Sequence, residues 1–242
     1  MNIIFRIAAR ELRAYFSTYS GYMILAAHLL LTGLLFNVYA VGDTVRFSTE
    51  VLEAFFYFSS GMAVLTGILL SMRLIAEERQ TQTLVLLRSA PVTERQVVWG
   101  KFFSALAVLC LTLLVSLYLP ALVMLNGKVS LGHVLTGYLG LLLIGGASIA
   151  ITLLASVWSP NQLIAGVTGA FMVALLIVVW MLARVTEEPL KQLFSYLALH
   201  NMHFMGFSKG ILDVGDVLYY GGVILLFVEG SAQAMLAWRW RE

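Results

Sequence analysis

Few side chains in this sequence have the chemistry of a reactive site, and most of them lie inside long apolar stretches. Glu229 stands in the run LLFVEGSAQAML. A charge at the centre of a membrane span costs about 2.5–3.5 kcal/mol on insertion scales, so such an acid is a candidate proton or cation site. The alternative is a protonated or hydrogen-bonded Glu that holds two helices together, and the lack of a second acid at matching depth favours it. His28 and Asn37, in another apolar stretch, are predicted to make hydrogen bonds between helices.

The sequence contains none of the common catalytic motifs. It has no GxxxxGK[ST] phosphate loop, no His-Glu-x-x-His pair and no GxSxG elbow, and the string Gly127-Lys128-Val129-Ser130 lacks the leading glycine. His200 and His203 have the spacing of ligands on one helical turn, but two histidines without a neighbouring Cys or acid make a poor metal site. A Ser148–His28 pair at similar depth stays open, although serine is common packing material in membrane helices. We therefore predict no catalytic site, metal or cofactor in this chain.

The composition is that of a membrane protein. Of 242 residues, 60% are hydrophobic and only 12% are charged, and the mean hydropathy is +0.90. A soluble domain of this length would expose large apolar patches, so an ordinary soluble enzyme and a disordered chain are both excluded. The formal net charge of +2 gives no argument for binding nucleic acid, and the single Cys110 excludes an internal disulfide.

Six apolar stretches are long enough to cross a bilayer as helices. They cover residues 19–41, 56–74, 98–125, 131–157, 163–184 and 216–238. Pro120 is expected to kink the third stretch near its far end, and Ser159-Pro160-Asn161 to end the fourth. The sequence thus predicts an all-α polytopic membrane protein, with residues 1–242 forming a single transmembrane domain.

Residues 1–17 are predicted to form an amphipathic helix at the membrane surface. Apolar residues recur at helical spacing, and Arg6, Arg10 and Arg13 fall on the other side. The alternative is a signal peptide, because Val38-Tyr39-Ala40 faintly resembles a cleavage site. The charged lead is too long for that, and the apolar stretch continues past Leu35, which favours an uncleaved first span.

The distribution of Lys and Arg predicts the orientation. With the N-terminus inside, the inner segments carry ten of these residues and the outer segments five. The positive-inside rule then places both termini in the cytoplasm.

Two connecting segments differ from simple loops. The cytoplasmic 75–97 segment is polar, with a predicted short amphipathic helix around Thr83–Leu87 that Pro91 ends, and with Thr93 as the cap of the next helix. The 185–215 segment, on the outside, is amphipathic and poor in charge, and we expect short helices that dip into the outer leaflet.

These two segments also carry a resemblance to a known family. The first match consists of Ser71-Met72-Arg73-Leu74-Ile75-Ala76-Glu77-Glu78-Arg79, Thr83-Leu84, Ser89-Ala90-Pro91-Val92-Thr93 and Val97-Val98-Trp99-Gly100-Lys101-Phe102; the second consists of His203-Phe204, Phe207, Gly210, Asp213, Asp216-Val217 and Tyr219-Tyr220. They resemble the first cytoplasmic loop and the segment before the last span of ABC-2 type transporter permeases. The resemblance extends over essentially the whole chain. It is closest to the branch that contains gliding-motility permeases and the permease of the nitrous-oxide-reductase maturation system.

The chain departs from the family pattern at two positions. Gln82 stands where the family often has Gly, and since Gln is compatible with a helix we expect a more continuous helix here. Val85 stands where the family often has Glu, which puts one contact with an ATPase in doubt.

The resemblance implies a permease subunit of an ATP-binding cassette exporter in the bacterial inner membrane. Such permeases have six spans, an N-terminal interfacial helix and a coupling helix in the first cytoplasmic loop. Two of them pair, as copies or as sister permeases, and each docks on a separate cytoplasmic ATPase that binds ATP and Mg. Membrane lipid and an envelope or periplasmic auxiliary protein are further expected partners.

The resemblance also implies roles for particular residues. The expected ATPase-coupling surface is Glu77, Glu78, Arg79, Leu84, Leu87 and Arg88, and the expected outer gate is His203, Phe204, Phe207, Gly210 and Asp213. The plainer interpretation of Glu77, Glu78 and Arg79 is the solvated, charged end of the second span.

Two other functions stay open at this point. One is an ion-coupled secondary transporter that uses Glu229, although no inverted repeat is visible in the sequence. The other is a membrane scaffold through which an ATPase does mechanical work on an envelope partner. The composition favours a lipidic, peptide or amphipathic cargo over a small polar solute.

Overall fold

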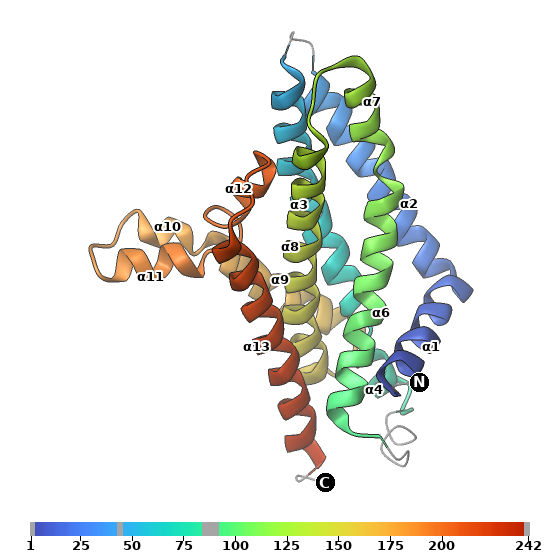
Figure 1. Ribbon diagram of the computed structural model, residues 1–242. Coiled ribbons are helices and arrows are strands. Elements are labelled where there is room, and N and C mark those ends of the chain that lie inside the picture. Colours follow the sequence, from blue (N-terminus) through green and yellow to red (C-terminus); the bar gives the residue numbers. More distant parts are fainter. Residues whose placement is uncertain (1–2, 43–45, 84–91, 240–242) are drawn as a thin grey trace.

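The computed structural model describes residues 3–42, 46–83 and 92–239, and in these ranges it contains helices and no strands. Six helical stretches among them are long and apolar enough to cross a membrane, which confirms the predicted all-α polytopic fold. Most of them run along one common direction as a bundle, whereas the stretch Gln162–Ala183 leads out of it to the side, and both chain termini lie at the same end (Figure 1). We call this end the terminal end and the opposite one the distal end.

The spans are single helices or pairs of consecutive helices. They are formed by α2 (Tyr19–Leu35) with η1 (Phe36–Val41), α3 (Ser48–Ser71) with α4 (Ala76–Gln80), α6 (Glu94–Val115) with α7 (Tyr118–Asn126), α8 (Leu131–Trp158), α9 (Gln162–Val178) with α10 (Trp180–Ala183), and α13 (Val214–Arg239). Outside the spans, α1 (Ile3–Ser17) packs on α6 at the terminal end. The 185–215 segment contains α11 (Leu190–Leu197) and α12 (Phe204–Ser208), and the α10–α11 hairpin projects sideways from the bundle (Figure 1).

Helix α8 is the centre of the bundle. It packs against α3, α13, α9, α6 and α12, and its residues from Ile144 to Val157 are buried without interruption. Its small residues permit this: a Cβ built on Gly140 would lie 2.5 Å from the Cβ of Phe207, closer than side chains ever approach. Glycine at this position therefore allows the 185–215 segment to pack directly on α8.

Helix boundaries depart from the predicted ones where packing or proline decides them. α3 begins at Ser48 rather than at 56, because the burial of Leu52 and Phe55 stabilises the additional helical turns. The third span is interrupted at Ser116 and Leu117, one turn before Pro120. Proline cannot donate to the carbonyl four residues back and clashes with it, so the interruption precedes Pro120 itself.

The cap predicted at Thr93 is confirmed. Its hydroxyl accepts a hydrogen bond from the Gln96 amide, and the Gln96 side chain accepts one from the Thr93 amide, which forms a capping box at the start of α6. After the predicted stop at 159–161, Asn161 caps α9 by accepting a hydrogen bond from the Ile164 amide.

The expectation of a continuous helix through Gln82 is wrong. α4 ends at Gln80, and Gln82 adopts a φ of +59°, in the left-handed region where glycine is favoured. This backbone conformation turns the chain out of the helix, and glycine would adopt it without strain. The expected coupling helix falls largely on residues 84–91, which lie outside the described residues.

Candidate functional site

Lys101 of α6 is almost completely buried, and it joins three elements of the terminal end. Its Nζ lies 2.8 Å from Glu78 Oε1 of α4 and 3.4 Å from Glu11 Oε1 of α1. Only 1% of the lysine side chain is exposed, so its desolvation has to be compensated by these two carboxylates. We call Glu11, Glu78 and Lys101 the ionic junction.

The approach of α1 to α6 is possible because residue 100 is glycine. A Cβ built on Gly100 would lie 2.7 Å from Ile7 Cγ2. Without a side chain there, α1 lies close enough for Glu11 to reach Lys101.

A second set of contacts fastens α1 to the end of α3. The guanidinium of Arg73 lies 4.8 Å above the Tyr15 ring, 3.1 Å from Glu77 Oε2, and donates to Ser20 Oγ at 2.5 Å. The Tyr15 hydroxyl donates to the Leu70 carbonyl at 2.5 Å. Burial raises the pKa of Tyr15 well above its ordinary value, so the hydroxyl keeps the proton that it donates.

The segment from Met72 to Arg79 is also fixed to the end of α8. Ser156 Oγ accepts hydrogen bonds from the amides of Ile75 and Ala76 at 3.2 and 3.0 Å, and it donates to the Met72 carbonyl at 3.1 Å. Arg79 donates to the Ser159 carbonyl at 3.3 Å. The base of the 75–97 segment is thus anchored to α1, α6 and α8.

A cavity of about 180 Å³ lies inside this anchored region. Its walls include the ionic junction together with Tyr15, Arg73 and Glu77. Glu78 Oε2 is buried and makes no hydrogen bond to any part of the chain that the structure describes. Lys101 therefore pairs with one of the two carboxylate oxygens of Glu78, and the cavity lies beside these charged side chains.

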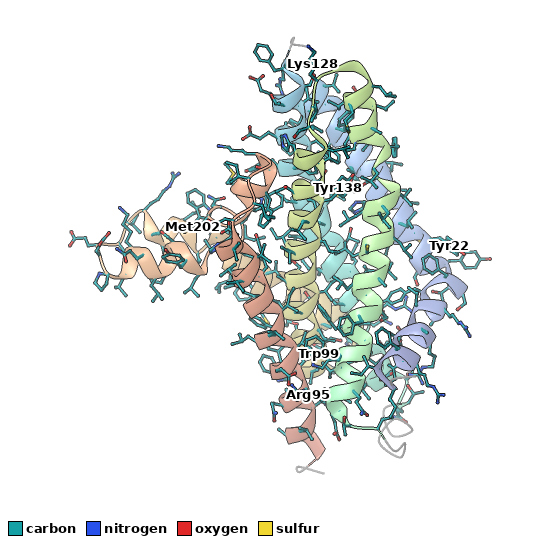
Figure 2. All side chains as sticks on the ribbon, in the orientation of Figure 1. Tyr22, Arg95, Trp99, Lys128, Tyr138 and Met202 are labelled. Carbon is teal, nitrogen blue, oxygen red and sulfur yellow. The ribbon has the colours of Figure 1, made fainter. Side chains whose placement is uncertain are left out.

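Glu229, which lies inside the span Val214–Ala237, links α13 to the first turns of α6. Its Oε1 lies 2.7 Å from Arg95 Nη2 and accepts a hydrogen bond from Trp99 Nε1 at 2.8 Å. Arg95 is the second residue of α6, and both partners lie on its first turns beside α13 (Figure 2). The arrangement is that of a carboxylate that holds two helices together.

The predicted gate residues of the 185–215 segment fall into two groups. Phe204 and Phe207 are fully buried, and His203 is buried beside them between α11 and α13. Gly210, with a φ of +77°, lies against His133 of α8. Asp213 is exposed, and its carboxylate accepts a hydrogen bond from the Gly215 amide at the start of α13.

His200 and His203 do not form a metal site. His200 Nε2 lies 2.7 Å from Ser60 Oγ of α3, whereas His203 contacts Asp216 of α13. Over residues 3–42, 46–83 and 92–239, no group of three or more His, Cys, Asp or Glu side chains is arranged to hold a metal ion.

Comparison with known families decides the class of the protein. The model of the family described as ABC-2 family transporter protein matches residues 15–214. The chain belongs to the ABC-2 family of transporter proteins. The match begins in α1 and ends at the first residue of α13, so it includes Glu78, Lys101 and nearly all of the 185–215 segment. No curated protein matches the chain.

In this ABC-2 family protein, the predicted coupling residues split into two sets. Glu78 pairs with Lys101 and Arg79 donates to the end of α8, so both turn towards internal partners. Glu77 pairs with Arg73, but 41% of its side chain is exposed. The other three residues, Leu84, Leu87 and Arg88, lie outside the described residues.

Sequence analysis missed the ionic junction, although one signal was present. Lys101 lies in the span 98–125, where a charge is expensive, and such a residue requires a partner. Nothing in the spacing of Glu11, 90 positions away, identified it as one of the partners.

The remaining predicted residues lie on α1 and α2. Arg6, Arg10 and Arg13 are exposed on the face of α1 that points away from the bundle. Asn37 is exposed in η1. His28 is buried, and its Nδ1 lies 2.8 Å from Thr66 Oγ1, which joins α2 to α3.

An apolar groove of about 1100 Å³ lies between α2, α3 and α9. Its walls are aliphatic over most of their length and include Leu31, Leu69 and Val167, while the His28–Thr66 pair supplies polar atoms. The groove is open to the side of the bundle, as expected of a surface that contacts lipid or another helix.

Proposed function

We propose that this ABC-2 family protein is the permease subunit of an ATP-binding cassette exporter in a bacterial inner membrane. Both termini lie in the cytoplasm, and a separate ATPase with bound ATP and Mg docks on the terminal end. The permease acts as a pair, with a second copy or a sister permease. Within the family, we assign the chain to the branch of gliding-motility and nitrous-oxide-reductase maturation permeases, on the sequence motifs around Glu77 and His203.

One observation supports this proposal most directly. The base of the 75–97 segment is joined to α1, α6 and α8 by Lys101, Arg73 and Ser156. A displacement of that segment by an ATPase is therefore passed to three elements at once. A simple solvated connector would not need these contacts, so the anchoring favours a coupling role for the segment.

The docking surface differs in one respect from the set of residues expected from the family. Glu78 and Arg79 serve the anchoring, while Gln80, Thr81 and Thr83 are exposed. We therefore propose that the ATPase contacts the exposed residues 80–83 and the adjoining part of the segment. Glu77, Glu78 and Arg79 act behind them as positioning residues.

The apolar groove supports a lipidic or amphipathic cargo. Its volume and aliphatic walls suit an acyl chain or an apolar peptide face better than a small polar solute. Mass spectrometry of molecules that co-purify with the protein tests this. We expect lipid-like molecules that are depleted in the Ala170→Trp variant, which narrows the groove, and equal retention would contradict the assignment.

The ion-coupled alternative receives no support from Glu229. Its carboxylate is engaged by Arg95 and Trp99, and no second acid is among its hydrogen-bonding partners in the described residues. Mechanical work on an envelope partner, rather than export, remains an outcome that the following experiment distinguishes.

The proposal is tested by purifying the tagged protein in mild detergent from native membranes and identifying all co-purifying proteins by mass spectrometry. We expect a soluble protein with a phosphate loop in stoichiometric amount. A stoichiometric envelope protein alongside it would favour mechanical work. An intact, folded chain that co-purifies with no such ATPase would contradict the proposal.

A further inference from the structure

His203 is held between two acceptors at the distal end. Its Nδ1 lies 2.7 Å from Asp216 Oδ1 on α13, and its Nε2 lies 3.1 Å from the Tyr196 carbonyl on α11. The ring stacks on Tyr219 with centroids 3.7 Å apart, and only 4% of the residue is exposed. The imidazole therefore helps to connect the 185–215 segment to the last span, beside hydrogen bonds from the Tyr219 hydroxyl to the Leu197 carbonyl at 3.0 Å and from the Tyr220 hydroxyl to the Leu199 carbonyl at 2.7 Å.

Both hydrogen bonds exist together only if the pair holds an additional proton. A carbonyl oxygen can only accept, so Nε2 must carry a hydrogen. Nδ1 then either donates to an ionised Asp216 or accepts from a protonated one. In both cases His203 and Asp216 share one more proton than a neutral imidazole beside a carboxylate, and loss of this proton breaks one of the two bonds.

Among the residues that the structure describes, Asp216 is the only charged partner of His203. The other side chains against the ring are Tyr219 and Tyr220 of α13 and Tyr196 of α11, all neutral phenols. Elsewhere in this region, His133 of α8 bonds the Ser208 carbonyl, and Lys209 lies 3.8 Å from Glu53 of α3. None of these groups replaces the bond that His203 loses.

The neighbouring His200 differs and serves as an internal comparison. It contacts Ser60 and Asn201, and no carboxylate is among these partners. Burial lowers the pKa of His200, because it disfavours the charged ring. Within the described residues, His200 therefore lacks the carboxylate partner that His203 has, and a substitution there is the matched control.

We propose that His203 and Asp216 form a proton-dependent latch that fastens the 185–215 segment to α13. With the proton bound, the imidazole bridges Asp216 and the Tyr196 carbonyl. When the proton leaves at higher pH, Nε2 or Nδ1 presents a lone pair to an acceptor, and one of the two bonds of His203 is lost. The contact between the segment and α13 is then weakened rather than released, because it still rests on the hydrogen bonds from the Tyr219 and Tyr220 hydroxyls to the Leu197 and Leu199 carbonyls. The segment remains on α8 through Phe204 and Phe207, so the movable seam is the one towards α13.

The latch is measured on the isolated protein in nanodiscs, so the result does not depend on an ATPase. A nitroxide is placed at Met202→Cys in a Cys110→Ala background, because Met202 is exposed on the segment next to His203 (Figure 2). The mobile fraction of its spectrum is followed between about pH 5 and pH 8, where histidine side chains titrate. We expect the mobile fraction to rise with pH through one midpoint.

Three variants separate the latch from a merely structural role. Asp216→Asn supplies an amide N–H that can donate to Nδ1, so a neutral imidazole keeps both bonds and the rise of the mobile fraction with pH should disappear. His203→Gln cannot release a proton, so the dependence on pH disappears, whereas His200→Gln keeps the midpoint of the parent. An unchanged midpoint in Asp216→Asn, its loss in His200→Gln, or a parent spectrum that does not vary with pH would overturn the proposal. If His203→Gln does not fold, the comparison of Asp216→Asn with the parent protein still tests the latch.

Discussion

The ionic junction and the packing of the 185–215 segment on α8 both join elements that are distant in the sequence. The first does so with charged side chains and the second with a close apolar contact. At the terminal end, Glu11, Glu78 and Lys101 meet beside a cavity of about 180 Å³. At the distal end, Phe207 presses directly against Gly140 with no space between them. Long charged side chains beside a cavity can exchange partners, whereas a ring packed on a glycine cannot slide without a clash. The junction therefore depends on charge pairing, whereas the contact on α8 depends on close packing.

The largest expected effect is at the junction. Lys101→Met removes the cation and leaves Glu11 and Glu78 as buried carboxylates without their partner, so we expect a loss of about 3–5 kcal/mol in the free energy of unfolding. Denaturant unfolding in detergent micelles measures it. The triple variant Lys101→Met, Glu11→Gln, Glu78→Gln should recover most of the loss, because no charge is then left buried. Equal stability of the single and triple variants would contradict the pairing.

At the distal contact, Gly140→Ala is expected to cost about 1–3 kcal/mol, because the new methyl group has to displace Phe207. Gly222→Ala on α13 is the matched control, since nothing lies within 4 Å of a Cβ at that position. Thermal unfolding of both variants in the same detergent gives the comparison. A loss of similar size in both would mean that close packing on α8 is not the cause.

A smaller effect of opposite sign is expected at the turn after α4. Gln82 has a φ of +59°, which costs a residue with a side chain about 1 kcal/mol relative to glycine. Gln82→Gly should therefore raise the unfolding temperature slightly, and Gln80→Gly, within α4, should lower it. If the Gln82→Gly protein is the less stable of the two, the left-handed turn does not form in solution.

The smallest effect is predicted at Glu229. The Arg95 side chain is largely exposed, so Glu229→Gln should lower the unfolding free energy by less than about 1 kcal/mol, and the amide oxygen can still accept from Trp99. Binding of the proposed ATPase should be unchanged. The ion-coupled interpretation would be restored by two results together: transport by the parent protein depends on a pH gradient, and the Glu229→Gln protein folds normally but does not transport.

Much of the fold could be predicted because long apolar runs leave few alternatives for a polypeptide in lipid. The start of α6 could also be predicted, since Thr93 and Gln96 form a capping box that depends on local sequence alone. The early start of α3 could not, because the burial of Leu52 and Phe55 depends on neighbouring helices.

The candidate sites were harder to predict, because their partners are distant in the sequence. Glu78 and Lys101 come from different helices, and Glu11 comes from a third. The orientation of Glu78 towards the interior, rather than towards an ATPase, is set by that pairing. The left-handed turn at Gln82 was missed because the helix propensity of Gln says nothing about where tertiary contacts end α4.

The central claim is that an ATPase binds the terminal end next to the anchored segment, and site-specific photocrosslinking tests it directly. A photoreactive amino acid is placed at Thr81, exposed beside the ionic junction, and in a parallel sample at Lys128, exposed at the distal end (Figure 2). After irradiation of intact cells, we predict that position 81 crosslinks to a soluble protein with a phosphate loop and that position 128 does not. Crosslinks to such a protein from position 128 alone, or from neither position in folded protein, would contradict the account.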